Sequence, residues 1–250
     1  MSTIDKAFHI VRQFTIENPH ITLAEMVRLS GFDKTTTRRL LLSLTQNEIL
    51  EKHPSGAGYQ LGILPLQLSR IRRRTSNFDQ SAEQVLNKLV STTNESAHIV
   101  VLSQNVLKNV FVVLPNRATH VSFADDEDVQ VHATASGMCF LAFSSDEDVD
   151  KALSQPLAKL TSFTETRPAK IRARLPEIKA SATIVMESTR EEDVSSIASP
   201  FFNSDGAFLG AISIAVPANR ASKETIEALA EAVRASSEEM TLKIGGVLPK

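Results

Sequence analysis

The sequence of 250 residues holds one cysteine, one tyrosine and no tryptophan. The lone Cys139 excludes an intramolecular disulfide and any zinc site built from several cysteines, and it favours a reducing compartment. No apolar run approaches the roughly 20 residues that a membrane-spanning helix needs. The first residues, MSTIDKAFHI, lack the apolar segment and cleavage site of a secretory signal. We therefore expect a cytoplasmic protein with no membrane partner.

The sequence also lacks the motifs of most enzymes. Its six histidines, at positions 9, 20, 53, 98, 120 and 132, show no paired metal-ligand spacing. There is no glycine-rich phosphate loop and no G-x-S-x-G nucleophile motif. The carboxylates at positions 125–128 lack the glycine turn of a calcium loop, so we interpret them as a solvated acidic loop. We predict no catalytic residue, no metal site and no cofactor.

Charge is distributed unevenly along the chain. The formal net charge is −2, but residues 1–75 carry 11 Lys and Arg against 6 Asp and Glu, a net +5. Residues 76–250 carry 16 against 23, a net −7. A basic first third favours contact with a polyanion through that third alone, and a chance fluctuation of surface charge is the alternative. The length and the 42% hydrophobic content suit two domains with cores of their own.

The segment DKTTTRRLLLSLTQ, at positions 33–46, joins a basic, hydroxyl-rich end to a leucine-rich end. Helical spacing places one set of side chains on a face that can be buried: Thr37, Leu40, Leu41 and Leu44. Asp33 is the predicted N-cap, which turns unpaired amides and the positive end of the helix dipole toward an anion such as a phosphate. The DNA-binding candidates of this helix are Lys34, Thr35, Thr36, Thr37, Arg38 and Arg39. Taken alone, the segment also fits a solvated basic turn on an ordinary amphipathic helix.

Two predicted helices precede this segment. The first covers residues 4–17 and ends before a proline. The second begins with a capping box of Thr22 and Glu25, and Gly31 can take a positive φ in the turn that ends it. Its apolar side chains, expected to point inward, are Leu23, Met26, Val27 and Leu29. This helix, the glycine turn and the following helix with its basic N-terminal end together predict a helix-turn-helix. Thr22 is a further DNA-binding candidate.

Residues 49–62 have the pattern of a small hairpin around a loop of Gly, Pro and Ser. Such a wing can lie along a minor groove or a phosphate backbone. His53 is the chargeable side chain of its tip, so we predict a weak DNA contact there. An exposed turn histidine is the alternative.

These motifs, in register over about 40 residues, resemble the winged helix-turn-helix of the IclR family of bacterial transcriptional regulators. The resemblance rests on Thr35-Thr36 and Arg39 in the recognition helix, the following leucines, and Tyr59-Gln60-Leu61-Gly62 at the strand end. It implies double-stranded operator DNA as a partner. It also implies a homodimer or a tetramer built as a dimer of dimers.

The remainder of the chain predicts a linking helix and an α+β domain. The basic end of the linking helix, 72–74, is interpreted as a spacer with solvated arginines. Helices are expected at 78–94, 146–153, 169–180 and from Ser222 onward. Strands are expected at 97–102, 106–114 and 117–123 as an antiparallel meander, and at 184–186, 194–202 and 209–217. The predicted domains are a DNA-binding domain at 1–62, a linker helix at 63–77 and an effector-binding domain at 78–250.

The second domain resembles the IclR effector domain, which implies a GAF-like α/β fold whose antiparallel sheet encloses a small ligand. His132, Ala133, Thr134 and Gly137 match a His-Ala-Thr/Ser-x-x-Gly segment of the family. Amides at the start of the following helix can receive an anion. The effector-binding candidates are Thr134, Ala135, Ser136, Gly137, Met186, Ser196, Ser213 and Ala215.

Three of these residues depart from the family pattern, because Met186, Ser196 and Ala215 stand where an aspartate, a cysteine and a serine are frequent. Losing polar groups favours a larger or more apolar effector, such as an aromatic or organic acid. The alternative is that Met186 and Ala215 belong to the core and the pocket is degenerate. We predict a metabolite-controlled transcriptional repressor. A DNA-binding scaffold without an effector, and an enzyme with a vestigial DNA domain, are the rival interpretations.

Overall fold

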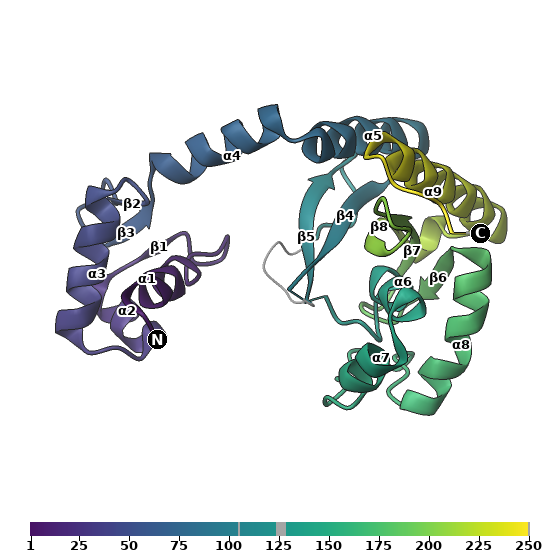
Figure 1. Cartoon of the computed structure of the whole chain (residues 1–250), viewed down its shortest axis with the longest axis horizontal. Helices are drawn as coiled ribbons and strands as arrows, with labels where there is room; N and C mark the ends of the chain where they lie inside the picture. Colours follow the sequence, from purple (N-terminus) through teal and green to yellow (C-terminus); the bar gives the residue numbers. More distant parts are fainter. Residues whose placement is uncertain (105, 124–128, 250) are drawn as a thin grey trace. The chain divides into compact units, whose positions relative to one another are not determined.

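The computed structural model describes residues 1–104, 106–123 and 129–249, so the acidic loop predicted at 125–128 lies outside the described residues. The chain divides into two compact units, Met1–Ser76 and Asn77–Lys250 (Figure 1). Each unit has its own hydrophobic core. None of the helices among the described residues is long and apolar enough to cross a bilayer.

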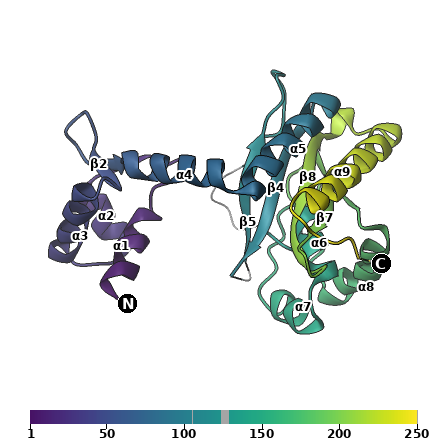
Figure 2. The ribbon, with the colours of Figure 1, turned by 45° about the horizontal axis from the view of Figure 1, so that its top comes forward.

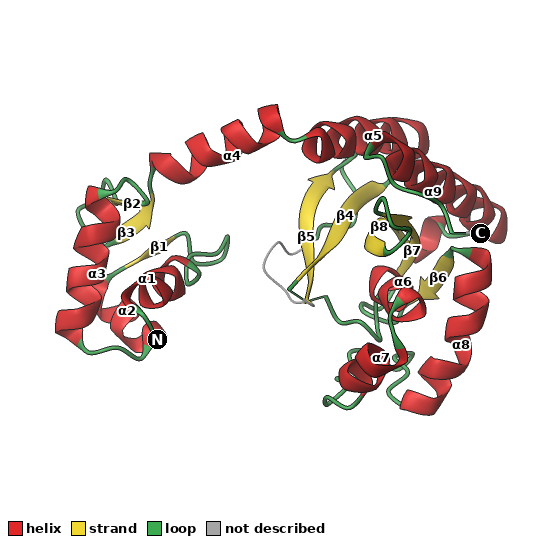
Figure 3. Cartoon of the chain, viewed as in Figure 1, coloured by secondary structure: helices red, strands yellow, loops and turns green. Residues whose placement is uncertain are grey.

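The first unit combines helices with a three-stranded antiparallel sheet of order β1-β3-β2 (Figure 3). Its elements are α1 (Thr3–Val11), β1 (His20–Ile21), α2 (Leu23–Ser30), α3 (Lys34–Gln46), β2 (Leu50–Lys52), β3 (Tyr59–Leu61) and α4 (Ile63–Thr75). This is the winged helix-turn-helix arrangement that the sequence predicts.

Local hydrogen bonds place the helix starts of this unit where the sequence predicts them. The Glu25 backbone N–H donates to the Thr22 hydroxyl at 3.3 Å, and the Thr22 N–H donates back to the Glu25 carboxylate at 2.8 Å. Asp33 caps α3 by accepting from the Thr36 N–H at 2.9 Å. Gly31, at φ +70°, ends α2 in the left-handed region that glycine adopts without steric cost. These contacts confirm the predicted caps and turn.

Two expectations for the first unit are wrong. Helix α1 ends at Val11 rather than at residue 17, because the next residues fold into tight turns; the Asn18 N–H, for example, donates to the Thr15 carbonyl at 3.2 Å. Leu29 was expected inside but is 43% exposed, and Ser30 is buried in its place. The buried face of α2 is centred on Met26, and Ser30 lies four residues further along that same face.

The second unit is built on a five-stranded antiparallel sheet of order β5-β4-β8-β7-β6. Its strands are β4 (Ser96–Ser103), β5 (Val106–Val113), β6 (Ile184–Glu187), β7 (Val194–Phe202) and β8 (Phe208–Pro217). Its helices are α5 (Asn77–Thr93), α6 (Ala135–Phe143), α7 (Asp146–Leu153), α8 (Pro168–Ser181), the short 3₁₀ helix η1 (Ala218–Arg220) and α9 (Lys223–Lys243).

The two faces of this sheet bury different layers. Alternate residues of β8, among them Ile212 and Ile214, pack in one core with α5 and α9, which lie side by side (Figure 2). Ala211, on the opposite face of β8, packs in a second core with α6, α7 and α8. Because strand side chains alternate between faces, the residues that the second layer leaves uncovered line a cavity.

The strand expected at 117–123 is wrong. These residues form no strand, and among the described residues the sheet ends at β5. A meander would pair this segment with β5, but among the described residues β5 pairs only with β4. The segment 117–123 instead folds over the sheet, with Val121 buried and Phe123 against the ring of His98.

Candidate functional site

The polar end of α3 presents cations and hydroxyl groups to solvent. Lys34, Thr35, Arg38 and Arg39 are exposed and Thr36 is half-buried. The leucine-rich end, with Leu40 and Leu41, is buried in the core of the first unit and holds the helix in place. The arrangement suits contact between a rigid helix end and an extended anionic surface.

Hydrogen bonds from the backbone, chiefly from the Thr36 N–H, hold the pKa of the Asp33 carboxyl below its usual range. The cap is therefore a charged carboxylate at neutral pH. The Thr36 amide donates to its side chain and the Thr37 amide to its carbonyl, which takes up two of the amides expected to face an anion. An anion at this surface would therefore contact the exposed side chains of α3 more than its first backbone amides.

Two of the predicted DNA-binding residues are placed differently from the expectation. Thr37 is 0% exposed, and its hydroxyl donates to the Asp33 carbonyl at 2.9 Å, so it packs inside and does not reach the surface. The Thr22 hydroxyl donates to the Glu25 carboxylate at 2.7 Å and accepts from the Glu25 N–H. Its bonding capacity is used within the helix cap.

His53 lies at the start of the wing tip and is half-buried. Its Nδ1 is 2.7 Å from the Ser55 hydroxyl, and its ring centroid is 4.6 Å from that of His20 on β1. The imidazole thus braces the wing against the neighbouring strand. This placement favours the interpretation of a turn histidine over that of a direct contact.

The second unit contains a cavity of about 740 Å³, including its open mouth. Its walls are the α6 side of the sheet, the segment 121–123, the start of α6 and the turn at 189–191. Six predicted effector-binding residues line it: Thr134, Ala135, Ser136, Ser196, Ser213 and Ala215.

Gly137 and Met186 do not line the cavity, which corrects the expectation for both. Met186 is 3% exposed and packs in the core beside α8, where its Sδ accepts from Arg174 at 3.3 Å. Gly137 is needed for packing, since a Cβ there would lie 2.4 Å from the Val131 Cα. Its amide donates to the Thr134 hydroxyl at 3.1 Å.

The start of α6 turns two backbone donors toward the cavity. Thr134 caps the helix, and its carbonyl and hydroxyl take the amides of Met138 and Gly137. The amides of Ala135 and Ser136 donate to no acceptor in the described part of the chain, and both residues line the cavity. Two such N–H groups at the positive end of a helix dipole suit a carboxylate.

The sheet wall of the cavity carries polar side chains from neighbouring strands. The Ser213 hydroxyl donates to the Ile197 carbonyl at 2.9 Å, so toward a ligand it can only accept. His98, directly opposite Ser213 in the register of β4 and β8, is half-buried, and its Nδ1 is shielded from solvent. Burial, and to a smaller extent the charge of Arg190, lowers the pKa of His98 to about 3, so the imidazole is neutral at physiological pH.

Two family models match the chain. The IclR helix-turn-helix domain matches residues 3–54, and the bacterial transcriptional regulator IclR C-terminal domain matches residues 74–242. The chain belongs to the IclR family. This IclR protein is therefore a DNA-binding transcriptional regulator, with the helix-turn-helix in its first unit.

Relatives of this IclR regulator align over nearly its whole length. The HTH-type transcriptional regulator KipR of Bacillus subtilis is 25% identical over 244 residues, or 97% of each chain. A structure from Silicibacter sp. TM1040, assigned to the IclR transcriptional regulators, has 32% identity and a TM-score of 0.87 over 99% of this chain and 98% of its own. An IclR homologue of Microbacterium hydrocarbonoxydans complexed with 4-hydroxybenzoate has 21% identity and a TM-score of 0.86 over 97% of this chain and 99% of its own.

Sequence reasoning missed several residues that line the cavity of this IclR regulator. None of His98, Asn109, Phe123 and Arg190 is among the predicted effector-binding residues, yet all four line the cavity. The available signal was a histidine and an asparagine inside two consecutive apolar strands. A polar side chain that is buried within such a strand needs a hydrogen-bond partner, and a bound ligand is one source of it.

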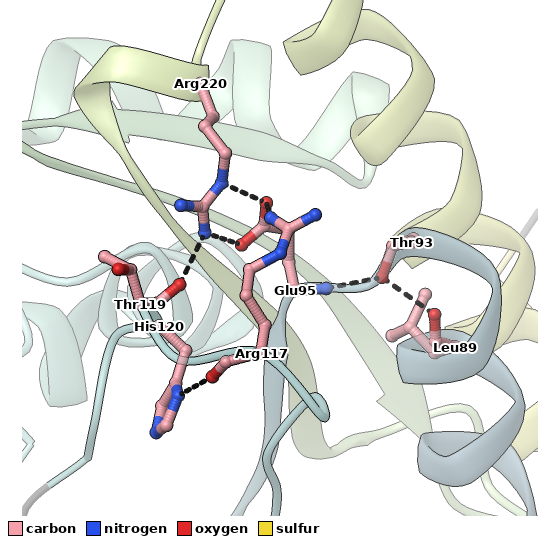
Figure 4. Close-up of polar contacts among 7 residues, drawn as sticks. All are labelled: Leu89, Thr93, Glu95, Arg117, Thr119, His120 and Arg220. Atoms are coloured by element: carbon pink, nitrogen blue, oxygen red, sulfur yellow. Dashed lines mark hydrogen bonds and ion pairs between the residues drawn. The ribbon is translucent and has the colours of Figure 1, made fainter.

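Two arginines and the buried carboxylate of Glu95 form an ion cluster at the start of the segment 117–123, which covers the cavity (Figure 4). The Glu95 carboxylate, at the start of β4, accepts from Arg220 at 2.8 and 2.6 Å and from Arg117 at 3.0 Å. Arg220 also donates to the Thr119 carbonyl at 3.3 Å. The hydrogen bond to Glu95 raises the pKa of the Arg220 guanidinium further above its usual value. The cluster ties residues 117–119 to the sheet, two residues before the cavity wall begins at Val121.

Proposed function

We propose that this IclR regulator is a repressor whose affinity for operator DNA is set by a small organic acid held in the cavity of the second unit. The observation that carries the proposal is the pair of unused amides of Ala135 and Ser136, two residues that line the cavity at the start of α6. The 4-hydroxybenzoate complex of the Microbacterium homologue supports an aromatic acid as the effector class. Ala215, which lines the cavity where the family frequently has a serine, also favours a less polar effector.

The proposed DNA-recognition surface is the exposed N-terminal end of α3. Arg38 and Lys34 are assigned to base edges in the major groove, and Thr35 and Thr36 to phosphates or thymine methyls. Arg39 is assigned to a phosphate, because its neighbour along the chain, Leu40, is anchored in the core.

The proposed assembly is a homodimer, alone or paired into a tetramer. None of the residues of α4 is buried within the chain, and the helix exposes large apolar side chains: Ile63, Leu66, Leu68 and Ile71. Such a surface suits contact with a second copy. Two copies would place two α3 helices in successive major grooves of a near-palindromic operator. The dimer would have two arrangements, one that binds the operator well and one that binds it poorly. Ligand binding can shift the balance between them only by as much as the ligand's affinity for the two arrangements differs.

Footprinting on genomic fragments tests the DNA-binding proposal, with Arg38→Ala and Arg39→Ala as a matched pair. Arg38→Ala should relax discrimination between operator and mutated operator by about 1–3 kcal/mol, since a base contact is lost. Arg39→Ala should weaken all sequences alike and lower the salt dependence by about one phosphate contact. The reverse pattern would exchange the two assignments.

Calorimetry with small acids tests the effector proposal. Aromatic acids should bind more tightly than glyoxylate-sized acids, because apolar side chains such as Val100, Val121 and Phe123 line the cavity and a ring contacts more of them. Tighter binding of the small acids would contradict it. Absence of a thermal shift across a broad metabolite panel would favour the rival interpretation, a DNA-binding scaffold without an effector.

A further inference from the structure

Unpaired polar atoms gather on one wall of the cavity. Four buried side-chain polar atoms among the described residues lack a hydrogen-bond partner: Ser96 Oγ, His98 Nδ1, Asn109 Oδ1 and Thr183 Oγ1. The first three lie on β4 and β5, and His98 and Asn109 line the cavity. Buried polar groups in folded proteins are nearly always paired, so two unpaired ones on the wall of a cavity indicate a partner that a ligand supplies.

A β-bulge aims Asn109 at this wall. Ile99 pairs with Phe111, but Val100 pairs with Asn109, so Val110 is the extra residue in β5. Opposed residues project to the same face of a sheet, so Asn109 joins Val100 on the cavity side, while Phe111 joins Ile99 in the other core. Strict alternation would have put Asn109 and Phe111 on one face. Bulges of this kind redirect side chains at functional sites.

We infer that His98 and Asn109 bind the polar end of the effector, and that this end is an uncharged hydroxyl group on the ring of an aromatic acid. The inference rests on the proposed function and deepens it. A hydroxyl group both donates and accepts, so it can donate to Asn109 Oδ1 and pair with His98 Nδ1 at once.

A second carboxylate does not suit this wall. It cannot donate to Asn109 Oδ1, and the neutral imidazole of His98 brings no charge to balance it. The cation that influences His98, Arg190, lies with its Nε 3.5 Å from the Glu191 carboxylate, which already offsets its charge. The single carboxylate of the ligand goes instead to the amides of Ala135 and Ser136.

The neighbouring side chains fit a flat ring. The Phe123 ring centroid lies 4.2 Å from that of His98 with the planes tilted by 54°. Val100, Val121 and Val129 add apolar surface around the same cavity. A planar ring carrying one hydroxyl and one carboxylate therefore meets apolar contacts along its faces and polar groups at its two ends.

Isothermal titration calorimetry with the three monohydroxybenzoates and with benzoate tests the inference in the full chain. The best hydroxybenzoate should bind at least tenfold more tightly than benzoate, since a hydroxyl that satisfies two buried groups contributes about that factor. In His98→Phe and in Asn109→Leu this ratio should fall to near one while benzoate binding persists. The matched control is Thr183→Val, which removes the unpaired hydroxyl that does not line the cavity and should leave the ratio unchanged.

Thermal unfolding without ligand separates a binding role from a structural one. Removing a buried polar atom that has no partner breaks no bond, so Asn109→Leu should melt at or above the wild-type temperature. A fall in melting temperature with an unchanged binding ratio would show that the residue is structural and would overturn the inference for it. In ¹⁵N-histidine NMR, the imidazole signal missing from His98→Phe should move with a hydroxybenzoate and stay in place with benzoate.

Two outcomes separate this inference from the proposed function. If an acid without a hydroxyl releases the operator footprint and no hydroxybenzoate binds better than benzoate, the effector-controlled regulator stands and the roles of His98 and Asn109 fall. If no acid binds and none changes the footprint, the proposed effector control itself fails.

Discussion

At the scale of single residues, burial decides the chemistry of His98. The imidazole is half-buried with its Nδ1 shielded from solvent, and desolvation lowers its pKa to about 3 from an ordinary value near 6.5. The titratable groups that line the cavity with it are Arg190 and Glu191. Because the unfolded chain takes up a proton that the native state refuses between those two pH values, His98 does not change stability above about pH 6.5 and destabilises the native state increasingly as the pH falls below it.

Urea unfolding of the wild type and of His98→Phe between pH 7 and pH 4.5 checks this sign. Below pH 6.5 the free energy of unfolding should fall by up to about 1.4 kcal/mol more per pH unit in the wild type than in the variant, since the native wild type excludes one proton that its unfolded chain binds. Carboxylates titrate equally in both proteins, so the difference isolates the histidine. Parallel stability curves would mean that His98 protonates in place.

At the scale of elements, two glycines end or begin helices for different physical reasons. Gly31 terminates α2 at φ +70°, with open space where a Cβ would be. Gly137 is in the first turn of α6, where a Cβ would lie 2.4 Å from the Val131 Cα and 2.6 Å from its carbonyl oxygen. The first glycine supplies a backbone conformation; the second permits close approach of two segments.

Gly31→Ala and Gly137→Ala should therefore differ in how much stability they cost and in whether they disturb the cavity. Gly31→Ala should cost about 1–2 kcal/mol of stability through the left-handed backbone alone. Gly137→Ala should cost more, because Val131 and the α6 start must move apart, and it should abolish acid binding in the cavity. Thermal unfolding and calorimetry check both, and equal losses in the two variants would refute the distinction.

The Glu95 cluster links three elements through one carboxylate. Arg117 and Arg220 keep 32% and 24% of their side-chain surface exposed, whereas Glu95 keeps 5%. Solvent therefore screens the arginines but hardly reaches the carboxylate between them. The cluster is better understood as an anchor for the cover segment than as a large source of stability.

Glu95→Gln should lower stability by about 1–3 kcal/mol, because two charge-assisted bonds to Arg220 are weakened. Hydrogen exchange in residues 117–123 should speed up more than in the rest of the second unit. Glu231→Gln is the control, since its ion pair with Arg234 lies on the surface and should cost less than about 1 kcal/mol. Unchanged exchange in the cover segment would contradict the anchoring role.

At the scale of the whole molecule, the cores follow the division of the chain. In the described part of the chain, the core of the first unit consists of residues 7–59, and the two cores of the second unit consist of residues after 77. The sheet of the second unit is complete within residues 96–217. Each unit thus has the contacts that a separately folding domain needs.

A fragment of residues 77–250 should accordingly melt in one cooperative transition and bind the same acids as the full chain. It should give no footprint on any operator, because α3 and the basic net charge of the first unit are missing. Calorimetry and gel shift on the fragment check both statements. A fragment without a cooperative transition would show that the second unit depends on the first.

Short-range chemistry is what the sequence by itself determined. Thr22, Asp33 and Ser222 cap helices through amides two or three residues away, and a helix-period apolar pattern predicts which face of α3 is buried. Such hydrogen bonds and periodicities involve neighbours in the chain, so they can be predicted without knowing the rest of the fold.

The tertiary structure alone decided where several side chains point. Asn109 faces the cavity because of one extra residue in β5, and Met186 faces the core because α8 covers its end of the sheet. Residues 117–123 cover a cavity because Glu95 and Arg220, far away in sequence, hold their first residues. These outcomes depend on strand register and on contacts between distant segments, and neither is written in the local sequence.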